Sequence, residues 1–278
     1  MRQGLLGVLA LAAVLTVAGC AGGTSSSTTV IVTTTRTVVE TRSVTVTTAP
    51  GPRSDEPTEV YVHFLRAGKV AAARRALPGS RDAEAGALRI LIEGPNEEER
   101  RAGLRTGVPK GTALVGLTIA SGLATPLLSE HFWASRAGLD ARVGQVVYTL
   151  TQFPSVQAVR FPQLLGPALS RPQLEDVTPA IFIETPVVGE RVESPIRVFG
   201  SANTFEANFT IRILDAGGAV LKETFVTATS GTGTRGTFDV RVPVGRGRSG
   251  PVTLVAFEPS AKDGTPLYTV RVPLELSR

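Results

Sequence analysis

Cys20 is the residue with the most distinctive chemistry in this sequence, because it is the only cysteine among 278 residues, and its position at the boundary of a leader excludes a Cys–His nucleophile. It follows Met1-Arg2, an apolar stretch over residues 5–17 and the small pair Ala18-Gly19. A short positive start, an apolar core and small residues before a cleavage point are typical of a secretory signal peptide. The core is shorter than the ~20 residues that a membrane-spanning helix needs. The sequence therefore predicts export, with processing close to Cys20.

The run Val17-Ala18-Gly19-Cys20 resembles the bacterial lipobox. This resemblance implies cleavage before Cys20, removal of residues 1–19 and attachment of lipid to the sulfur. The alternative is an ordinary signal peptide followed by an incidental cysteine. We expect a protein anchored by lipid on Cys20 to the extracytoplasmic face of the cell membrane, with no thiol or disulfide left in its folded part.

Other residue types that support catalysis or metal binding are sparse. The sequence contains two histidines, His63 and His131, and no serine in the Gly-x-Ser-x-Gly arrangement of a nucleophile elbow. Zinc sites normally take three or four ligands, and these two histidines give no such spacing. A wall hydrolase would need paired carboxylates in a cleft, for which Glu84 and Glu93 are the candidates. We expect no catalytic residue, no metal site and no cofactor.

The charge balance also limits the class of partner. The net charge is +5, from 29 basic and 24 acidic residues, and arginine supplies most of the positive charge. A surplus of this size does not indicate nucleic acid, which would also be an unusual partner outside the membrane. The expected partners are the membrane, through lipid on Cys20, and peptidoglycan or other envelope proteins.

Residues 20–57 differ in composition from the rest of the chain, because threonine, serine and valine dominate them. They contain too little large apolar surface to offset the entropy lost on folding, which is typical of a linker. Alternation of threonine and valine could also form a strand. We favour a tether between the lipid anchor and the folded part.

Residues 58–168 are predicted to form a small α+β domain. Val60, Val62 and Phe64 alternate on one face of a strand over 59–65, while Tyr61 and His63 lie on the other. The further elements are helices over 82–93 and 141–151 and strands over 114–119, 123–128 and 156–164. This gives the order β-α-β-β-α-β, with both helices on one sheet face. Residues 97–101 are expected on the solvated surface.

Three motifs in this domain resemble the sporulation and spore germination domain called GerMN. They are Leu91-Ile92-Glu93-Gly94-Pro95, Val108-Pro109-Lys110-Gly111-Thr112 and, most specific, Gln145-Val146-Val147-Tyr148-Thr149-Leu150-Thr151-Gln152-Phe153-Pro154. Pro126 departs from the family pattern, because proline cannot donate to a strand ladder. Its strand should therefore lie at a sheet edge or contain a bulge.

Residues 178–278 are predicted to form an all-β sandwich of about seven short strands, with glycine and proline turns between them. Ser194-Pro195, Gly200-Ser201-Ala202-Asn203-Thr204-Phe205-Glu206-Ala207 and Ser260-Ala261-Lys262-Asp263-Gly264 resemble the immunoglobulin-like domain of bacterial spore germination. That domain is known to accompany GerMN domains on exported proteins, so the resemblance of both halves, in this order, is more specific than either alone.

The sequence supports three hypotheses about function. The preferred one is a non-enzymatic, lipid-anchored envelope protein resembling sporulation and germination proteins, which binds other proteins or peptidoglycan. The alternatives are an envelope enzyme such as a wall hydrolase and a small-ligand-binding lipoprotein, which would show an apolar pocket between its domains. Tyr61 and His63 are the candidate partner contacts, on a sheet face left open by the helices; otherwise they pack beneath the loop over residues 66–80.

Overall fold

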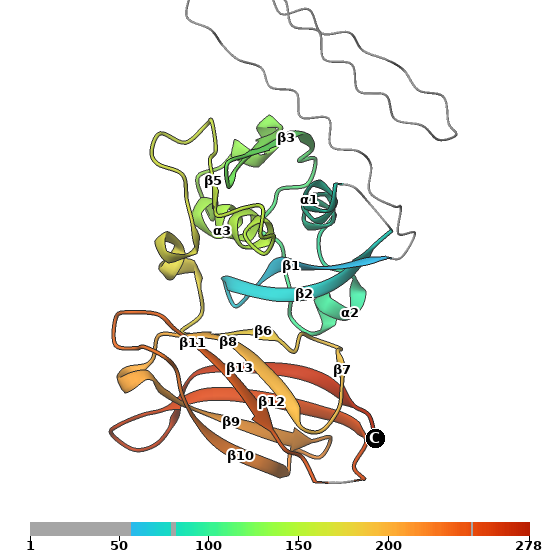
Figure 1. Cartoon of the computed structure of the whole chain (residues 1–278), viewed down its shortest axis with the longest axis vertical. Coiled ribbons are helices and arrows are strands. Elements are labelled where there is room, and N and C mark those ends of the chain that lie inside the picture. Colours follow the sequence, from blue (N-terminus) through green and yellow to red (C-terminus); the bar gives the residue numbers. More distant parts are fainter. Residues whose placement is uncertain (1–56, 79–81, 246) are drawn as a thin grey trace, which may run out of the picture. The chain divides into compact units, whose positions relative to one another are not determined.

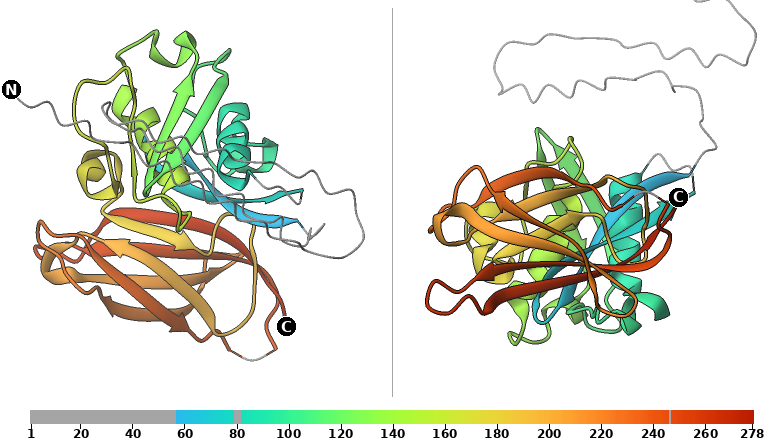
Figure 2. Two further views of the ribbon diagram at one scale, coloured as in Figure 1. Left: turned by 45° about the horizontal axis from the view of Figure 1, so that its top comes forward. Right: turned by 90° about the horizontal axis from the view of Figure 1, so that it is seen from below.

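The computed structural model describes residues 57–78, 82–245 and 247–278. Cys20 and the tether, except its last residue, lie outside the described residues. The chain divides into two units, residues 1–51 and 52–278, and every described residue belongs to the second unit. Within this unit an α+β domain is followed by an all-β domain (Figures 1 and 2). The predicted fold class is therefore confirmed.

The first domain contains a two-stranded sheet, a three-stranded sheet and helices packed against them. The two-stranded sheet is β1-β2, and the three-stranded sheet has the order β3-β4-β5. In chain order the elements are β1 (Thr58–Arg66), β2 (Lys69–Leu77), α1 (Ala83–Glu93), α2 (Glu97–Arg101), β3 (Leu114–Ala120), β4 (Leu123–Leu128), the 3-10 turn η1 (Glu130–Trp133), α3 (Leu139–Leu150) and β5 (Ala158–Val159).

The predicted order of elements omitted β2, and the segment expected as a loop is the second strand of a hairpin. Ala67 and Gly68, with φ of 49° and 78°, form its two-residue turn. The segment Lys69–Leu77 is rich in alanine and arginine, which have no preference for strands, so local propensity hides it. Packing explains the strand, because β2 lies between the helices and β6 of the second domain (Figure 1).

The acidic and basic run Glu97–Arg101 forms the short helix α2 and, as expected, lies on the solvated surface, with the exception of Glu99. Glu99 is 6% exposed and accepts a hydrogen bond from the backbone N–H of Asn96. Its carboxylate also pairs with Arg75 of β2 at 2.7 Å. A capping box and an ion pair therefore bring this glutamate into the fold.

Pro126 lies in β4, the central strand of its sheet, so the predicted edge position was wrong. Pairing with β5 ends at Ala124, so at Pro126 only the β3 side of the strand is paired. The missing N–H is therefore not needed for a second ladder, and a register shift in β3 between Leu114 and Gly116 follows close by. The closing strand was predicted over 156–164, but β5 covers only Ala158–Val159.

Helix α3 completes the outer edge of β1 with side chains in place of a third strand. Thr149 accepts the His63 N–H at 3.0 Å, and Gln145 donates to the His63 carbonyl at 3.1 Å. Gln152 accepts the N–H of Tyr61 and donates to its carbonyl. Gln145 and Thr149 are four positions apart on α3 and Gln152 lies in the turn just after it, so polar side chains of α3 and of this turn face the strand. This gives a structural reason for the most specific of the three GerMN motifs.

The second domain is a sandwich of a five-stranded and a three-stranded sheet, with the orders β10-β9-β12-β13-β7 and β11-β8-β6. Its strands are β6 (Ile181–Thr185), β7 (Arg191–Val192), β8 (Ile196–Ala202), β9 (Asn208–Asp215), β10 (Val220–Thr227), β11 (Gly236–Val242), β12 (Gly250–Pro259) and β13 (Pro266–Leu276). The 3-10 turns η2 (Arg171–Val177) and η3 (Phe205–Ala207) precede β6 and β9. The alternating strands bury one continuous apolar core between the sheets.

In the part of the chain that the structure describes, no helix combines the length and apolar character needed to cross a membrane.

Candidate functional site

The predicted contact residues Tyr61 and His63 do not lie on an open surface. His63 is 1% exposed and Tyr61 is half-buried, because the second domain packs against this face of the β1-β2 hairpin. The Tyr61 hydroxyl lies 3.2 Å from Oγ1 of Thr185 in β6. The expectation of exposure was wrong because it treated the first domain by itself. The alternative was also wrong, since the covering element is not the 66–80 segment.

His63 occupies an apolar position between the two domains. Its ring centroid lies 5.5 Å from that of Tyr148 and 6.0 Å from that of Phe182. Burial, and secondarily the positive charge of Arg171, lowers the pKa of His63 well below its ordinary value. Neither ring nitrogen has a hydrogen-bond partner among the described residues. The imidazole is therefore held neutral and acts as an apolar packing group.

Ion pairs surround this contact between the domains. Arg74 of β2 lies 3.4 Å from Glu190, and Arg171 of η2 lies 2.9 Å from Glu184. These pairs are partly buried, so solvent screens them less than it would on an open surface. They fix the orientation of the hairpin and of η2 relative to the sandwich.

A further pair ties the connection between the domains to the sandwich. Glu175 of η2 accepts two hydrogen bonds from Arg235, at 2.7 and 2.8 Å, and one from Asn203 at 2.9 Å. The bond from Arg235 is the main reason that the pKa of Glu175 is lowered. A forked arginine–carboxylate pair of this kind constrains geometry as well as charge.

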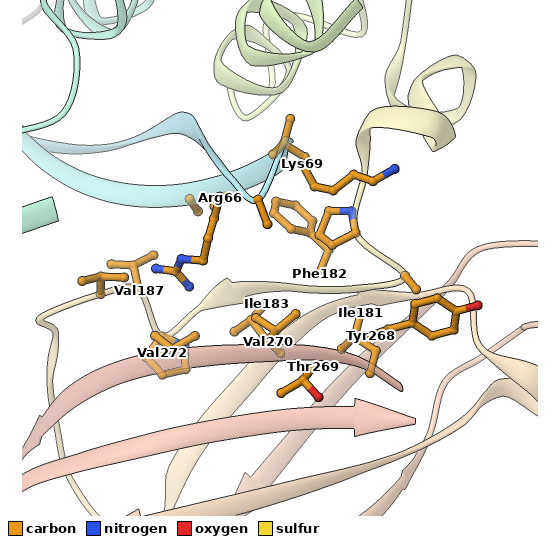
Figure 3. Close-up of a pocket in the computed structure, with 18 residues that line it drawn as sticks. Arg66, Lys69, Ile181, Phe182, Ile183, Val187, Tyr268, Thr269, Val270 and Val272 are labelled. Atoms are coloured by element: carbon orange, nitrogen blue, oxygen red, sulfur yellow. The ribbon is translucent and has the colours of Figure 1, made fainter. Parts of the chain in front are cut away.

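A cavity of about 220 Å³ lies between the β1-β2 hairpin and strands β6 and β13 (Figure 3). Its lining is apolar apart from two basic side chains and two hydroxyl groups: Arg66, Ala67, Lys69, Val70, Ala71, Ala72, Pro179, Ala180, Ile181, Phe182, Ile183, Pro186, Val187, Val188, Tyr268, Thr269, Val270 and Val272. Concave, mostly apolar sites with a few polar groups, placed between domains, are the usual location of small-ligand binding. This is the candidate functional site.

Arg66 is the residue of this cavity whose side chain could form specific hydrogen bonds with a ligand. Its Nη1 donates to the carbonyl of Arg271 in β13 at 2.6 Å. Its Nε and Nη2 are out of contact with solvent and have no partner among the described residues. Burial lowers the pKa of this guanidinium. In Figure 3, Arg66 and Tyr268 lie on opposite sides of the apolar residues Ile183 and Val270.

Sequence reasoning did not identify Arg66 or the cavity. The residues that line it come from two domains and are separated by more than a hundred positions, so no local pattern joins them. The available signal was the expectation that a ligand-binding lipoprotein would have an apolar pocket between its domains.

The two candidate carboxylates of the wall-hydrolase hypothesis do not form a pair with each other. Glu84 and Glu93 are nine positions apart on α1, which places them about 13.5 Å apart along the axis and on opposite faces. Paired carboxylates in glycoside hydrolysis lie roughly 5–9.5 Å apart. Within the described ranges, no group of three or more His, Cys, Asp or Glu side chains is placed to hold a metal ion.

Comparison with known families agrees with the division of the fold. Residues 57–162 match the family described as "Sporulation and spore germination", and residues 180–265 match the "Immunoglobulin-like domain of bacterial spore germination". The class of protein is thus a two-domain chain of sporulation- and germination-related modules. More particularly, a GerMN domain is followed by the immunoglobulin-like domain of bacterial spore germination.

Solved structures resemble parts of the chain. The first GerMN domain of the sporulation protein GerM from Bacillus subtilis is 26% identical, over 40% of this chain and 86% of that one, with a TM-score of 0.34. The tandem GerMN domains of the same protein are 18% identical, over 67% of this chain and 61% of that one, with a TM-score of 0.36. CopC from Methylosinus trichosporium OB3b is 15% identical, over 35% of this chain and 93% of that one, with a TM-score of 0.25.

Because these TM-scores are low, the domain assignment depends on the two family matches. No curated protein matches the chain.

Proposed function

We propose that this chain is a lipid-anchored protein of the cell envelope that acts in a sporulation- or germination-related process by binding, without catalysis. The observation that carries the proposal is the pairing of the two family-matched domains in one compact unit. The ion pairs of Arg74 and Arg171 hold the two domains in a defined orientation, as a binding module requires. The anchor rests on Cys20 and the segment before it.

Lipid attachment is tested by metabolic labelling of the full chain with a fatty-acid probe. Cys20→Ser is expected to abolish labelling and to leave the protein unprocessed or released from the membrane. Membrane retention and lipid incorporation unchanged by the substitution would reject the anchor.

Binding to the wall or to another protein is tested with the lipidated full chain. Sedimentation with purified peptidoglycan is expected to deplete the protein from solution if the polymer is the partner. Crosslinking in intact cells is expected to give a discrete adduct if the partner is a protein. Absence of both results would reject a role in partner binding.

The cavity between the β1-β2 hairpin and strands β6 and β13 favours a second candidate function, that of a small-ligand-binding lipoprotein. A binding protein of this kind encloses its ligand in an apolar pocket, and here the pocket also contains the guanidinium of Arg66. The two candidates are compatible, because a ligand held between the domains would strengthen their packing. The test for the second candidate function is the melting temperature of the full chain with and without a small apolar compound. An increase would support small-ligand binding.

A further inference from the structure

Arg66 differs from the other arginines of the hairpin and the domain contact in having no acidic partner among the described residues. Each of the others pairs with a glutamate, as in the pairs Arg74–Glu190, Arg75–Glu99, Arg171–Glu184 and Arg235–Glu175. Among the described residues, the guanidinium of Arg66 donates one hydrogen bond, from Nη1 to the carbonyl of Arg271. Arg66 is partly buried, and its Nε and Nη2 are out of contact with solvent, so an anionic partner at these two nitrogens would be favourable.

The geometry of the free side of Arg66 fits a carboxylate. Nη1 is occupied by the Arg271 carbonyl, whereas Nε and Nη2 are buried and free. These two nitrogens form one edge of the planar guanidinium and can donate two parallel hydrogen bonds. Carboxylates accept such bonds in a bidentate arrangement, and a phosphate can do the same.

The lining of the cavity restricts the rest of the ligand. It contains no Asp or Glu, so no carboxylate there would pair with the ammonium of an amino acid or an amine. The remaining surface is mainly valine, isoleucine, alanine, proline and phenylalanine. A volume of about 220 Å³ lies below the roughly 300–1,000 Å³ of typical ligand pockets. The ligand is therefore small, with a short apolar tail, which favours a monocarboxylate over a highly hydrated phosphate.

We propose that the cavity between the β1-β2 hairpin and strands β6 and β13 binds a small monocarboxylate with an apolar tail, whose carboxylate pairs with Nε and Nη2 of Arg66 after a shift of the side chains that cover these two nitrogens. The tail lies against Ile183 and Val270. This inference rests on the second candidate function, the binding of a small ligand, and adds the chemical class of that ligand.

The test uses the full chain in a non-ionic detergent and three probes with the same tail: hexanoate, 1-hexanol and hexylamine. Isothermal titration calorimetry, with detergent alone as the blank, measures the affinity of each. Hexanoate is expected to bind about tenfold to a hundredfold more tightly than hexanol, as is typical of hydrogen bonds to a charged group. Hexylamine is expected to bind more weakly than either.

Three variants locate the binding. Arg66→Met is expected to remove the preference for hexanoate over hexanol, while Arg101→Met, at a side chain that is 70% exposed, keeps it. Val270→Phe fills the cavity and is expected to abolish binding of both probes. Arg66→Met removes a charge that has no acidic partner among the described residues, together with one hydrogen bond to the Arg271 carbonyl, and is expected to fold. If it does not fold, two results still test the proposal: the comparison of hexanoate with hexanol in the wild type, and the loss of binding in Val270→Phe.

The outcomes separate this inference from the function on which it rests. Equal affinities for hexanoate and hexanol, both lost in Val270→Phe, would overturn the carboxylate assignment but keep a small-ligand site. Preference for hexanoate that survives Arg66→Met would also overturn the assignment. If no probe binds to the wild type, both the carboxylate assignment and the proposed small-ligand site are overturned.

Discussion

The imidazole of His63 in β1 and the phenyl ring of Phe182 in β6 lie 6.0 Å apart between their centroids, inclined at 46°. Tyr148 of α3 completes the group, with its ring centroid 5.3 Å from that of Phe182. Phe182 belongs to the second domain, yet its side chain is part of the buried apolar cluster of the first. The two domains therefore share a part of their core.

The first prediction concerns pH and follows from the lowered pKa of His63. In the unfolded chain this imidazole takes up a proton near pH 6.5, whereas in the folded chain it stays neutral to lower pH. The unfolded state then binds more protons, so the free energy of unfolding falls as the pH drops below about 6.5. The slope is expected to approach about 1.4 kcal/mol per pH unit from this group.

Chemical denaturation between pH 4.5 and 8 measures this slope, with buffers at constant ionic strength. His63→Leu is expected to reduce it, since the backbone bonds of this residue to α3 do not involve its ring. His131→Gln, at an exposed position, is the matched control. A slope that is the same in His63→Leu and the wild type would contradict the prediction.

The second prediction concerns the shared core. Phe182→Ala removes a side chain that is 1% exposed, and changes of this type typically cost about 3–5 kcal/mol. Phe225→Ala, at a position 65% exposed on β10, is expected to change stability by less than about 1 kcal/mol. Urea unfolding of the full chain measures both. Similar losses in the two variants would show that Phe182 is not part of a core between the domains.

The third prediction concerns the polar side chains of α3 that face β1. Thr149→Val keeps the shape of the side chain but leaves the buried N–H of His63 without its acceptor. An unsatisfied buried donor costs about 1–3 kcal/mol. Thr118→Val, on the exposed side of β3, is the control and is expected to be nearly neutral.

Hydrogen exchange gives an independent measurement of the same bond. The His63 amide is expected to exchange faster in Thr149→Val than in the wild type, while amides of the second domain's β9 change little. Unchanged exchange at His63 would mean that Thr149 does not protect it.

The fourth prediction concerns Gly200 in β8. A Cβ atom at this position would lie 2.0 Å from the carbonyl oxygen of Phe182, which is backbone and cannot move aside. Gly200→Ala is therefore expected to cost about 1–3 kcal/mol or more through overpacking. Gly116→Ala in β3, where no atom lies within 4 Å, is the control. Equal melting temperatures of the two variants would reject this contact.

The sequence by itself determined the features that depend on local pattern. The alternating strands of the sandwich, the helices near 82–93 and 141–151 and the resemblance to two germination-related domains are all properties of short segments. Each depends on periodicity or on turn residues a few positions apart, which the chain displays without folding. The lipid anchor on Cys20 is of the same local kind and stays a prediction.

Only the tertiary structure decided which distant segments of the chain contact one another. Lys69–Leu77 became a strand because it lies between helices and another sheet, against its own weak propensity. His63 was buried against Tyr148 and Phe182, which are distant in sequence, and this burial lowered its pKa. Arg66 became part of a candidate ligand site because residues of β6 and β13 line the same cavity. Burial depends on segments distant in sequence, and no local pattern records which of them will meet.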